Sequence, residues 1–241
     1  LACTDHRAIA EIPDDMEIGE AAAMATQGAT AWYMSMLSWP VQAGMLVLVH
    51  SAAGGVGQLL TQIAVQNGCE VFAVAHGAEK MAYLKGLGAQ HVIDRKEGDY
   101  AMAVQELLAK ERLDVSFNAV GGTTFKKDLH LLGSGGAVVL FGGAERGAGG
   151  GLGTLRFVWN MGLVIPIFLM MQCKSLVGVN MLRLSEHRPL TVAACMQGAL
   201  DAMREGWLKP RVDRVFDTEQ LPEALKLLGS GKSIGKVAVK W

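Results

Sequence analysis

The stretch Met45-Leu-Val-Leu-Val-His-Ser-Ala-Ala-Gly-Gly-Val-Gly-Gln58 decides the fold of this chain. Its apolar start predicts a buried strand, and the apolar residues of 56–67 recur at helical spacing. Ala52, Gly54 and Gly57 stand at the three positions of the pattern G-x-G-x-x-G, with alanine in place of the first glycine. A strand, a glycine turn and a helix in this order are typical of a dinucleotide site, where the helix N-terminus binds the pyrophosphate.

The two glycines of this pattern have different expected roles. Gly54 allows the backbone to approach the pyrophosphate closely, and Gly57 allows the helix to pack against the strand. Ordinary strand-to-helix turns show similar glycine patterns, so the pattern alone leaves that alternative open. The flanking strand and helix favour the dinucleotide interpretation.

Short apolar strands alternate with helices along most of the chain. Further strands are predicted at 70–74, 91–94, 114–117, 137–141 and 175–179, and helices at 79–87, 100–110, 125–132 and 190–205. Apolar strands separated by helices indicate a parallel sheet covered on both faces. We therefore expect an α/β fold with a doubly wound parallel Rossmann sheet.

The two ends of the chain follow this alternation less well. An Ala-rich helix is predicted at 19–24, and a strand, a helix and a strand at 211–216, 218–228 and 236–240. Both ends fit a second, smaller domain of which only part is present. The chain also begins at Leu1 rather than at a methionine, which is consistent with a fragment or a processed form.

Composition and cysteine spacing exclude several classes of protein. The formal net charge is -1, so long-range electrostatics gives no reason to expect nucleic acid as a partner. Cys3, Cys69, Cys173 and Cys195 lie far apart and form no CxxC pair, so neither a structural zinc site nor a disulfide framework is expected. The interpretation is a cytoplasmic protein with reduced thiols. The absence of G-x-S-x-G and of G-x-x-x-x-G-K-[ST] speaks against a hydrolase and a nucleoside triphosphatase.

One segment, 157–171, is almost entirely apolar. A membrane-spanning helix needs about 20 apolar residues, and this segment is shorter and contains Pro166. We expect a core helix or the wall of a hydrophobic substrate pocket here, and no membrane contact.

The residues after the second strand bear on which dinucleotide is bound. An NAD site places Asp or Glu at the end of that strand to bind the ribose hydroxyls. Here the sequence is Ala75-His-Gly-Ala-Glu-Lys80, with no acid directly after the strand. His76, Lys80 and Arg95 can instead face a 2′-phosphate, which predicts NADP(H) rather than NAD(H). Lys80 or Arg95 taken alone is more often an ordinary solvated charge, and the two together with the missing acid favour NADP(H).

Several motifs together resemble the zinc-independent medium-chain dehydrogenase/reductases. This family includes quinone oxidoreductases, vesicle amine transport proteins and the enoyl reductase domains of fatty-acid and polyketide synthases. The resemblance runs over essentially the whole chain. Its motifs are Ala25-Thr-Gln-Gly-Ala-Thr-Ala-Trp-Tyr33, His50-Ser-Ala-Ala-Gly-Gly-Val-Gly-Gln58, Glu79-Lys80, Leu87-Gly-Ala-Gln-His-Val-Ile-Asp94, Asp114-Val-Ser-Phe-Asn-Ala-Val-Gly-Gly122 and Gly231-Lys-Ser-Ile-Gly-Lys-Val237.

The resemblance implies a set of cofactor contacts and a domain division. The cofactor residues are Thr30 near the nicotinamide; Ala53, Gly54, Gly55, Val56 and Gly57 around the pyrophosphate; His76, Lys80 and Arg95 around the 2′-phosphate; Asn118 and Val120 on the adenosine side; and Phe141, Gly142 and Gly143 beside the nicotinamide ribose. Residues 1–27 would end a GroES-like catalytic domain whose front part is missing, 28–209 would bind NADP(H), and 210–241 would return to the catalytic domain. A homodimer through the edge strand 175–179 is also implied.

Three departures from the family pattern are informative. Thr26 stands where the zinc-dependent branch has a metal-binding Cys, four residues before Thr30, so no metal is expected. Gly143 replaces a Lys that enoyl reductases carry, and Asn180 lies near the place of an Asp. The proton donor is therefore not identified, and Tyr33, His50 and Asn180 are the candidates.

The expected reaction is hydride transfer from NADPH to a quinone or an activated alkene. The substrate would be a hydrophobic small molecule or an acyl group. One alternative is an enoyl reductase module of a synthase, which the segment Ser185-Glu-His-Arg188 favours. The other is a non-catalytic NADPH-binding interaction protein, associated with a membrane through 157–171.

Overall fold

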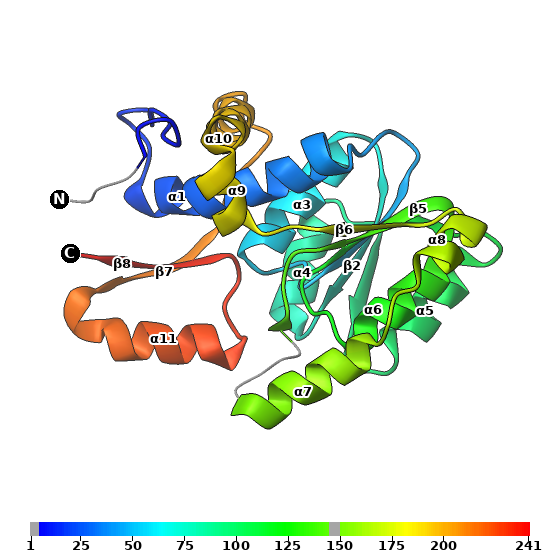
Figure 1. The fold of residues 1–241 in the computed structure, drawn as a ribbon. Coiled ribbons are helices and arrows are strands. Elements are labelled where there is room, and N and C mark those ends of the chain that lie inside the picture. The colour runs from blue at the N-terminus through cyan, green and yellow to red at the C-terminus, as the bar shows by residue number, and fades with distance from the viewer. Residues whose placement is uncertain (1–4, 145–149) are drawn as a thin grey trace.

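A six-stranded parallel sheet forms the centre of the computed structural model, which describes residues 5–144 and 150–241 (Figure 1). The strand order is β3-β2-β1-β4-β5-β6, the order of a doubly wound Rossmann sheet. The strands are β1 (Leu46–His50), β2 (Glu70–Ala75), β3 (His91–Asp94), β4 (Leu113–Asn118), β5 (Leu132–Leu140) and β6 (Ser175–Gly178). The predicted fold class is confirmed. β5 begins at Leu132, five residues before the predicted start at 137. A register shift in its pairing with β4 separates this early part from the predicted strand.

Helices cover both faces of the sheet, which explains why β1 is apolar from Leu46 to Val49. Val47 and Val49 face a core shared with α3 (Gly55–Gln66), α4 (Ala78–Gly86) and α10 (Pro189–Arg204). Leu46 and Leu48 face the opposite core, with α5 (Tyr100–Leu108) and α6 (Thr123–Leu131). Successive side chains of a strand point to opposite faces, so a strand buried on both faces is apolar except where a polar side chain has a buried partner, as His50 has in Asp128.

The N-terminal helical segment is longer than predicted. It runs through α1 (Ile18–Ala23), the π-helical turns η1 (Met24–Gly28), α2 (Ala29–Trp32) and the π-helical turns η2 (Tyr33–Ser38). Glycine and threonine give residues 26–30 a low helix propensity, which hid this extension. Packing against α10 overrides that propensity, because a Cβ at Gly28 would already touch that of Ala199.

The C-terminal segment docks on α3 through side-chain amides. Gln58 accepts a hydrogen bond from Arg211 N at 3.0 Å and donates one to Arg211 O at 3.2 Å. Gln62 pairs with both backbone groups of Lys209 in the same way. Beyond this segment, β7 (Val212–Asp217) and β8 (Lys236–Lys240) form a parallel pair connected by α11 (Leu221–Ser230). Helix α1 contacts β7 and β8, so the two ends of the described chain lie close to each other (Figure 1).

The expectation of a core helix over 157–171 is wrong. The segment forms two helices, α7 (Gly150–Met161) and α8 (Pro166–Gln172), and α9 (Met181–His187) follows β6. Trp159 is 83% exposed and Leu163 is 86% exposed. Among the described residues, no single helix is long and apolar enough to cross a membrane, although α7 and α8, bent by 43°, pass that test as a pair.

Candidate cofactor-binding site

The glycine turn joins β1 to α3 at the edge where parallel strands end. Gly54 is the extended N-cap of α3, and the helix begins at Gly55. A Cβ at Gly57 would collide with the Ser51 carbonyl oxygen and lie 2.8 Å from Ala52 Cα, so this position requires glycine. The first N–H groups of a helix lack partners within it, and here they open onto the turn.

Gly55 provides room for a side chain from another part of the fold. A Cβ there would collide with the side-chain amide of Gln27, which crosses over the turn from η1. Gln27 Oε1 is buried and has no hydrogen-bond partner among the described residues. An unpaired buried carbonyl is costly, so this oxygen indicates a place where a donor from a bound molecule is accepted.

A cavity of about 630 Å³ lies on one side of the glycine turn. Its lining comes from the loops and helices that follow five neighbouring strands and from the C-terminal segment: Ser51, Ala53, Gly54, His76, Lys80, Arg95, Gly98, Asp99, Tyr100, Val120, Thr124, Lys127, Ala144, Gly231 and Ser233 among others. The carboxyl ends of parallel strands meet at one edge, which is why these distant residues share a cavity.

Three cationic or ionisable side chains line one end of this cavity. Lys80 Nζ donates to the Gly231 carbonyl at 2.5 Å, and Arg95 lies close enough to affect it electrostatically. Burial and, to a smaller extent, the charge of Arg95 lower the pKa of Lys80 from its usual value. His76 completes this group and also lines the cavity. A half-buried lysine beside an exposed arginine fits a dianionic phosphate ester.

Asp94 is an acid beside this cluster that the sequence argument did not weigh. Its carboxylate accepts hydrogen bonds from Lys96 N, Gly77 N and His76 Nδ1 at 2.9, 3.1 and 3.0 Å. These bonds, the two backbone donors first, lower its pKa to about 2. Asp94 is not among the residues that line the cavity. Its oxygens are therefore committed to the turn after β2 rather than presented to a ribose.

Asn118 and Val120 occupy the turn after β4. Asn118 is fully buried, and its Oδ1 accepts hydrogen bonds from Val120 N and Gly121 N, each at 2.8 Å. Its amide donates to Asp128 at 2.5 Å and to Thr124 Oγ1 at 3.0 Å. The Asn118 side chain thus shapes the turn, while Val120 lines the cavity.

A second cavity, of about 670 Å³, lies at the other side of the glycine turn. Its lining is mostly apolar: Thr30, Val56, Leu140, Phe141, Gly142, Gly178, Val179, Asn180 and Met181. Thr30 donates its hydroxyl to Thr26 O at 2.6 Å. A Cβ at Gly142 would lie 2.5 Å from Ala119 O, so only glycine fits where the loops after β4 and β5 meet.

The structure brings together most of the predicted residues. Ala53, Gly54, His76, Lys80, Arg95 and Val120 line the first cavity, and Thr30, Val56, Phe141 and Gly142 line the second. Gly55, Gly57 and Asn118 act from within the turns, and Gly143 lies against Phe157. Sequence reasoning missed Tyr100, Thr124 and Lys127, and it gave Gln27 no role although Gln27 lies in the first of the family motifs. Gly231 and Ser233 lie in the last of the family motifs, which was the available signal for them.

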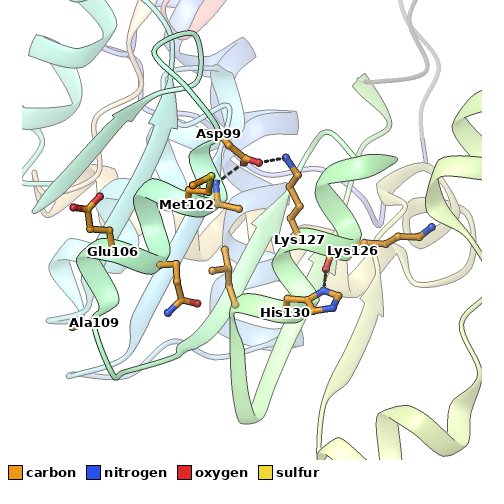
Figure 2. Close-up of a pocket in the computed structure, with 10 residues that line it drawn as sticks. Asp99, Met102, Glu106, Ala109, Lys126, Lys127 and His130 are labelled. Atoms are coloured by element: carbon orange, nitrogen blue, oxygen red, sulfur yellow. Dashed lines mark hydrogen bonds and ion pairs between the residues drawn. The ribbon is translucent and has the colours of Figure 1, made fainter.

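A third cavity, of about 790 Å³, is an open groove between α5 and α6. Asp99 and Lys127, which form an ion pair at 2.7 Å, line both this groove and the first cavity, so the pair stands in the shared wall (Figure 2). Lys126 points away from Lys127 in the same view. The groove lies on the outer side of the site.

The described cysteines offer neither a metal site nor a nucleophile in this region. Cys69 and Cys195 are buried, and burial raises the pKa of each thiol to about 11, so both stay protonated. Over residues 5–144 and 150–241, no group of three or more His, Cys, Asp or Glu side chains could hold a metal ion.

The sheet order and the glycine turn define a protein of the Rossmann dinucleotide-binding class. The family described as zinc-binding dehydrogenase matches residues 55–195. The chain is 30% identical to a highly reducing polyketide synthase of Cryptosporiopsis over 99% of this chain and 10% of that protein. It is also 30% identical to the human synaptic vesicle membrane protein VAT-1 homolog-like, over 98% of this chain and 57% of that protein.

Three solved structures are similar over nearly the whole chain. The mycobacterial protein Rv1454c complexed with NADPH has a TM-score of 0.80 at 28% identity, covering 95% of this chain and 66% of that one. The CurK enoyl reductase has a TM-score of 0.80 at 26% identity, and the match covers 98% of this chain and 67% of that one. A Pseudomonas syringae quinone oxidoreductase has a TM-score of 0.79 at 25% identity, and the match covers 95% of this chain and 67% of that one. The chain belongs to the medium-chain dehydrogenase/reductases, in their zinc-independent branch. The chain spans 10% of the length of the polyketide synthase and 57% of the length of the VAT-1 homolog-like protein.

Proposed function

We propose that this chain binds NADP(H) across the two cavities and transfers hydride to a quinone or an activated alkene. The observation that carries the proposal is the cluster of Lys80, Arg95 and His76 at one end of the glycine turn. A 2′-phosphate fits these cations, and Asp94, the nearby acid, is held in hydrogen bonds to the turn. The NADPH complex of a mycobacterial relative supports the choice of cofactor.

The residues present fit an extended dinucleotide. Gly54 and the start of α3 would hold the pyrophosphate, and the first cavity would hold the adenosine half. Thr30, Phe141 and Gly142 would hold the nicotinamide half in the second cavity, where the bound cofactor supplies the hydride. The largely apolar side chains of this lining favour a hydrophobic or acyl substrate.

The three candidates for proton donor differ in their surroundings. His50 is 2% exposed and its Nε2 is held by Asp128, and Tyr33 packs against two apolar clusters. Asn180 alone lines the second cavity. Its Oδ1 accepts a hydrogen bond from Arg183 N at 3.1 Å, so its NH₂ group is directed away from the start of α9. An amide donates a hydrogen bond but not a proton, so Asn180 would stabilise the developing oxyanion while water supplies the proton.

The test begins with titration of the full chain with NADPH and NADH, followed by fluorescence. We expect clearly tighter NADPH binding, and equal or tighter NADH binding would overturn the phosphate assignment. Turnover is then measured with quinones, enones and crotonyl thioesters. Tight NADPH binding with no turnover on any of these acceptors would favour the non-catalytic alternative.

An enoyl reductase module of a larger synthase is the second candidate. The match to a polyketide synthase over 99% of this chain favours it. It uses the same fold and the same cofactor, so only the acceptor separates the two proposals. Reduction of crotonyl thioesters without reduction of quinones would select the synthase module.

A further inference from the structure

The segment formed by α7, the residues 162–165 and α8, here called the α7–α8 arm, carries a large apolar surface. In Figure 1 it runs in yellow-green outside α6. Its exposed large apolar side chains are Leu155, Val158, Trp159, Leu163, Ile165, Ile167, Phe168, Met170 and Met171. Large apolar surfaces that remain exposed to water mark interaction sites.

The inner side of the arm is fixed to the body, so its outer side is not a displaced part of the core. The Phe157 ring packs on Gly121, with its Cζ only 2.8 Å from the position that a Cβ of Gly121 would take. Met161 Sγ accepts a hydrogen bond from Gly122 N at 3.0 Å, and Met161 and Val164 pack on the α5–α6 core. A helix that is apolar on both sides needs a second apolar partner.

The charge around the arm indicates what that partner is. From Arg146 to Ser185 the sequence contains no Asp or Glu, in a chain with 23 acidic residues. Lys174 Nζ donates to Leu129 O, and Arg183 on α9 is paired with Glu186, so both are already engaged. The cation on the arm itself is Arg156, which is exposed. Lys126 of α6 adds another, since its Nζ lies 2.9 Å from the position of a Cβ at Gly162, between the two helices. An apolar surface bordered by cations is complementary to an anionic bilayer.

The geometry of the arm fits insertion parallel to the bilayer surface. At 1.5 Å per residue, neither helix approaches the roughly 30 Å of a hydrocarbon core. The 43° bend between them at the break before Pro166 also prevents one continuous span. Trp159 and Phe168 are exposed aromatic side chains, and tryptophan favours the interface between headgroups and acyl chains.

We propose that the outer side of the α7–α8 arm inserts into the surface of an anionic lipid bilayer. Trp159, Leu163 and Phe168 enter the acyl region, and Arg156 and Lys126 face the headgroups. This attachment is independent of the proposed hydride transfer, because none of these five side chains lines the two cofactor cavities.

The experiment is flotation of the full chain with vesicles of phosphatidylcholine, with and without phosphatidylserine. The test variant is W159E/L163E, whose two positions are almost fully exposed, so the fold is retained. The matched control is L190E, an exposed leucine on α10. Circular dichroism checks the fold of all three proteins.

We expect the parent chain and L190E to float with the phosphatidylserine vesicles. The fraction of W159E/L163E that is bound should be lower by a factor of about ten or more. Failure of the parent chain to bind, or equal binding by W159E/L163E, would overturn the proposal. Equal binding to both vesicle types would also overturn it, since the anionic surface would then play no part. If W159E/L163E instead turns a dimer into a monomer without vesicles, a second copy covers this face and the proposal is wrong.

Discussion

His50 Nε2 lies 3.0 Å from both carboxylate oxygens of Asp128, and both side chains are buried beneath the glycine turn. Asp128 also accepts hydrogen bonds from Tyr100, Ser116 and Asn118. One carboxylate in α6 thereby connects the ends of β1 and β4 with the start of α5. Since His50 precedes the glycine turn and Asn118 shapes the next one, Asp128 holds two walls of the first cavity in register.

Replacing Asp128 with Asn should therefore destabilise the fold strongly. The new amide would direct a donor at side chains that are already donors, leaving buried groups unpaired. We expect a loss of roughly 2–4 kcal/mol in the free energy of unfolding, measured with urea. The control is Asp201→Asn, where the acid is exposed on α10 and the expected loss is below about 1 kcal/mol. Equal losses would show that the Asp128 cluster contributes little.

The stability of the fold should fall in acid partly through Asp94. Its pKa in the folded chain is about 2, below the usual 3.8, so the folded state favours the charged carboxylate. That contribution is complete above the unfolded pKa and is lost as the pH falls from about 4 towards 2. The unfolding free energy of Asp94→Asn should thus depend less steeply on pH in this window than that of the parent chain. Parallel pH profiles would contradict this assignment.

Gly57→Ala should damage the turn because the new methyl group would collide with the Ser51 carbonyl. We expect a loss of about 1–3 kcal/mol in the free energy of unfolding, and weakened dinucleotide binding, since either the helix or the strand must move. Gly86→Ala is the matched control, because a Cβ there has no neighbour within 4 Å and its backbone is helical. That control should be neutral or stabilising by up to about 1 kcal/mol. Unchanged binding by Gly57→Ala would contradict the close packing of α3 on β1.

β6 is the proposed contact of a homodimer. It is an edge of the six-stranded sheet and is paired with β5, and no other described strand pairs with its second side. Val177 packs against the core, whereas Leu176 is exposed and is the better position to change. Leu176→Lys should convert the dimer into a monomer in sedimentation velocity. A dimer that persists in this variant would place the contact elsewhere.

The sequence predicted the sheet because each strand is a short apolar run with a helix after it. It also brought Lys80 and Arg95 into one site, since they follow neighbouring strands that end at the same edge. The Asp128 cluster escaped prediction for the opposite reason. Its partners come from β1, β4 and α5, and nothing near position 128 indicates that a carboxylate there is buried.

The α7–α8 arm shows a different limit of sequence reasoning. Apolar composition alone predicts that 157–171 avoids water, and a core helix and a lipid-facing helix satisfy that requirement equally well. Only the packing of Phe157 and Met161 on the body distinguishes the inner side from the outer. The helix through residues 24–38 was missed because contacts with α10, distant in sequence, override weak local propensity.

The preference for NADPH should depend on Arg95 and Lys80 rather than on the general charge of α4. Arg95→Gln removes a guanidinium that makes no hydrogen bond to another described side chain, so the fold should be unaffected. A charge-assisted bond to a phosphate contributes about 1.5–3 kcal/mol, so the Kd for NADPH should rise roughly 10- to 100-fold. NADH has no 2′-phosphate, and its Kd should stay within about twofold. Lys80→Ala should act in the same direction, while Lys85→Ala, on the exposed side of the same helix, should change neither Kd. If Arg95→Gln weakened both cofactors equally, the cation would serve the pyrophosphate or the fold, and the basis for choosing NADP(H) would be lost.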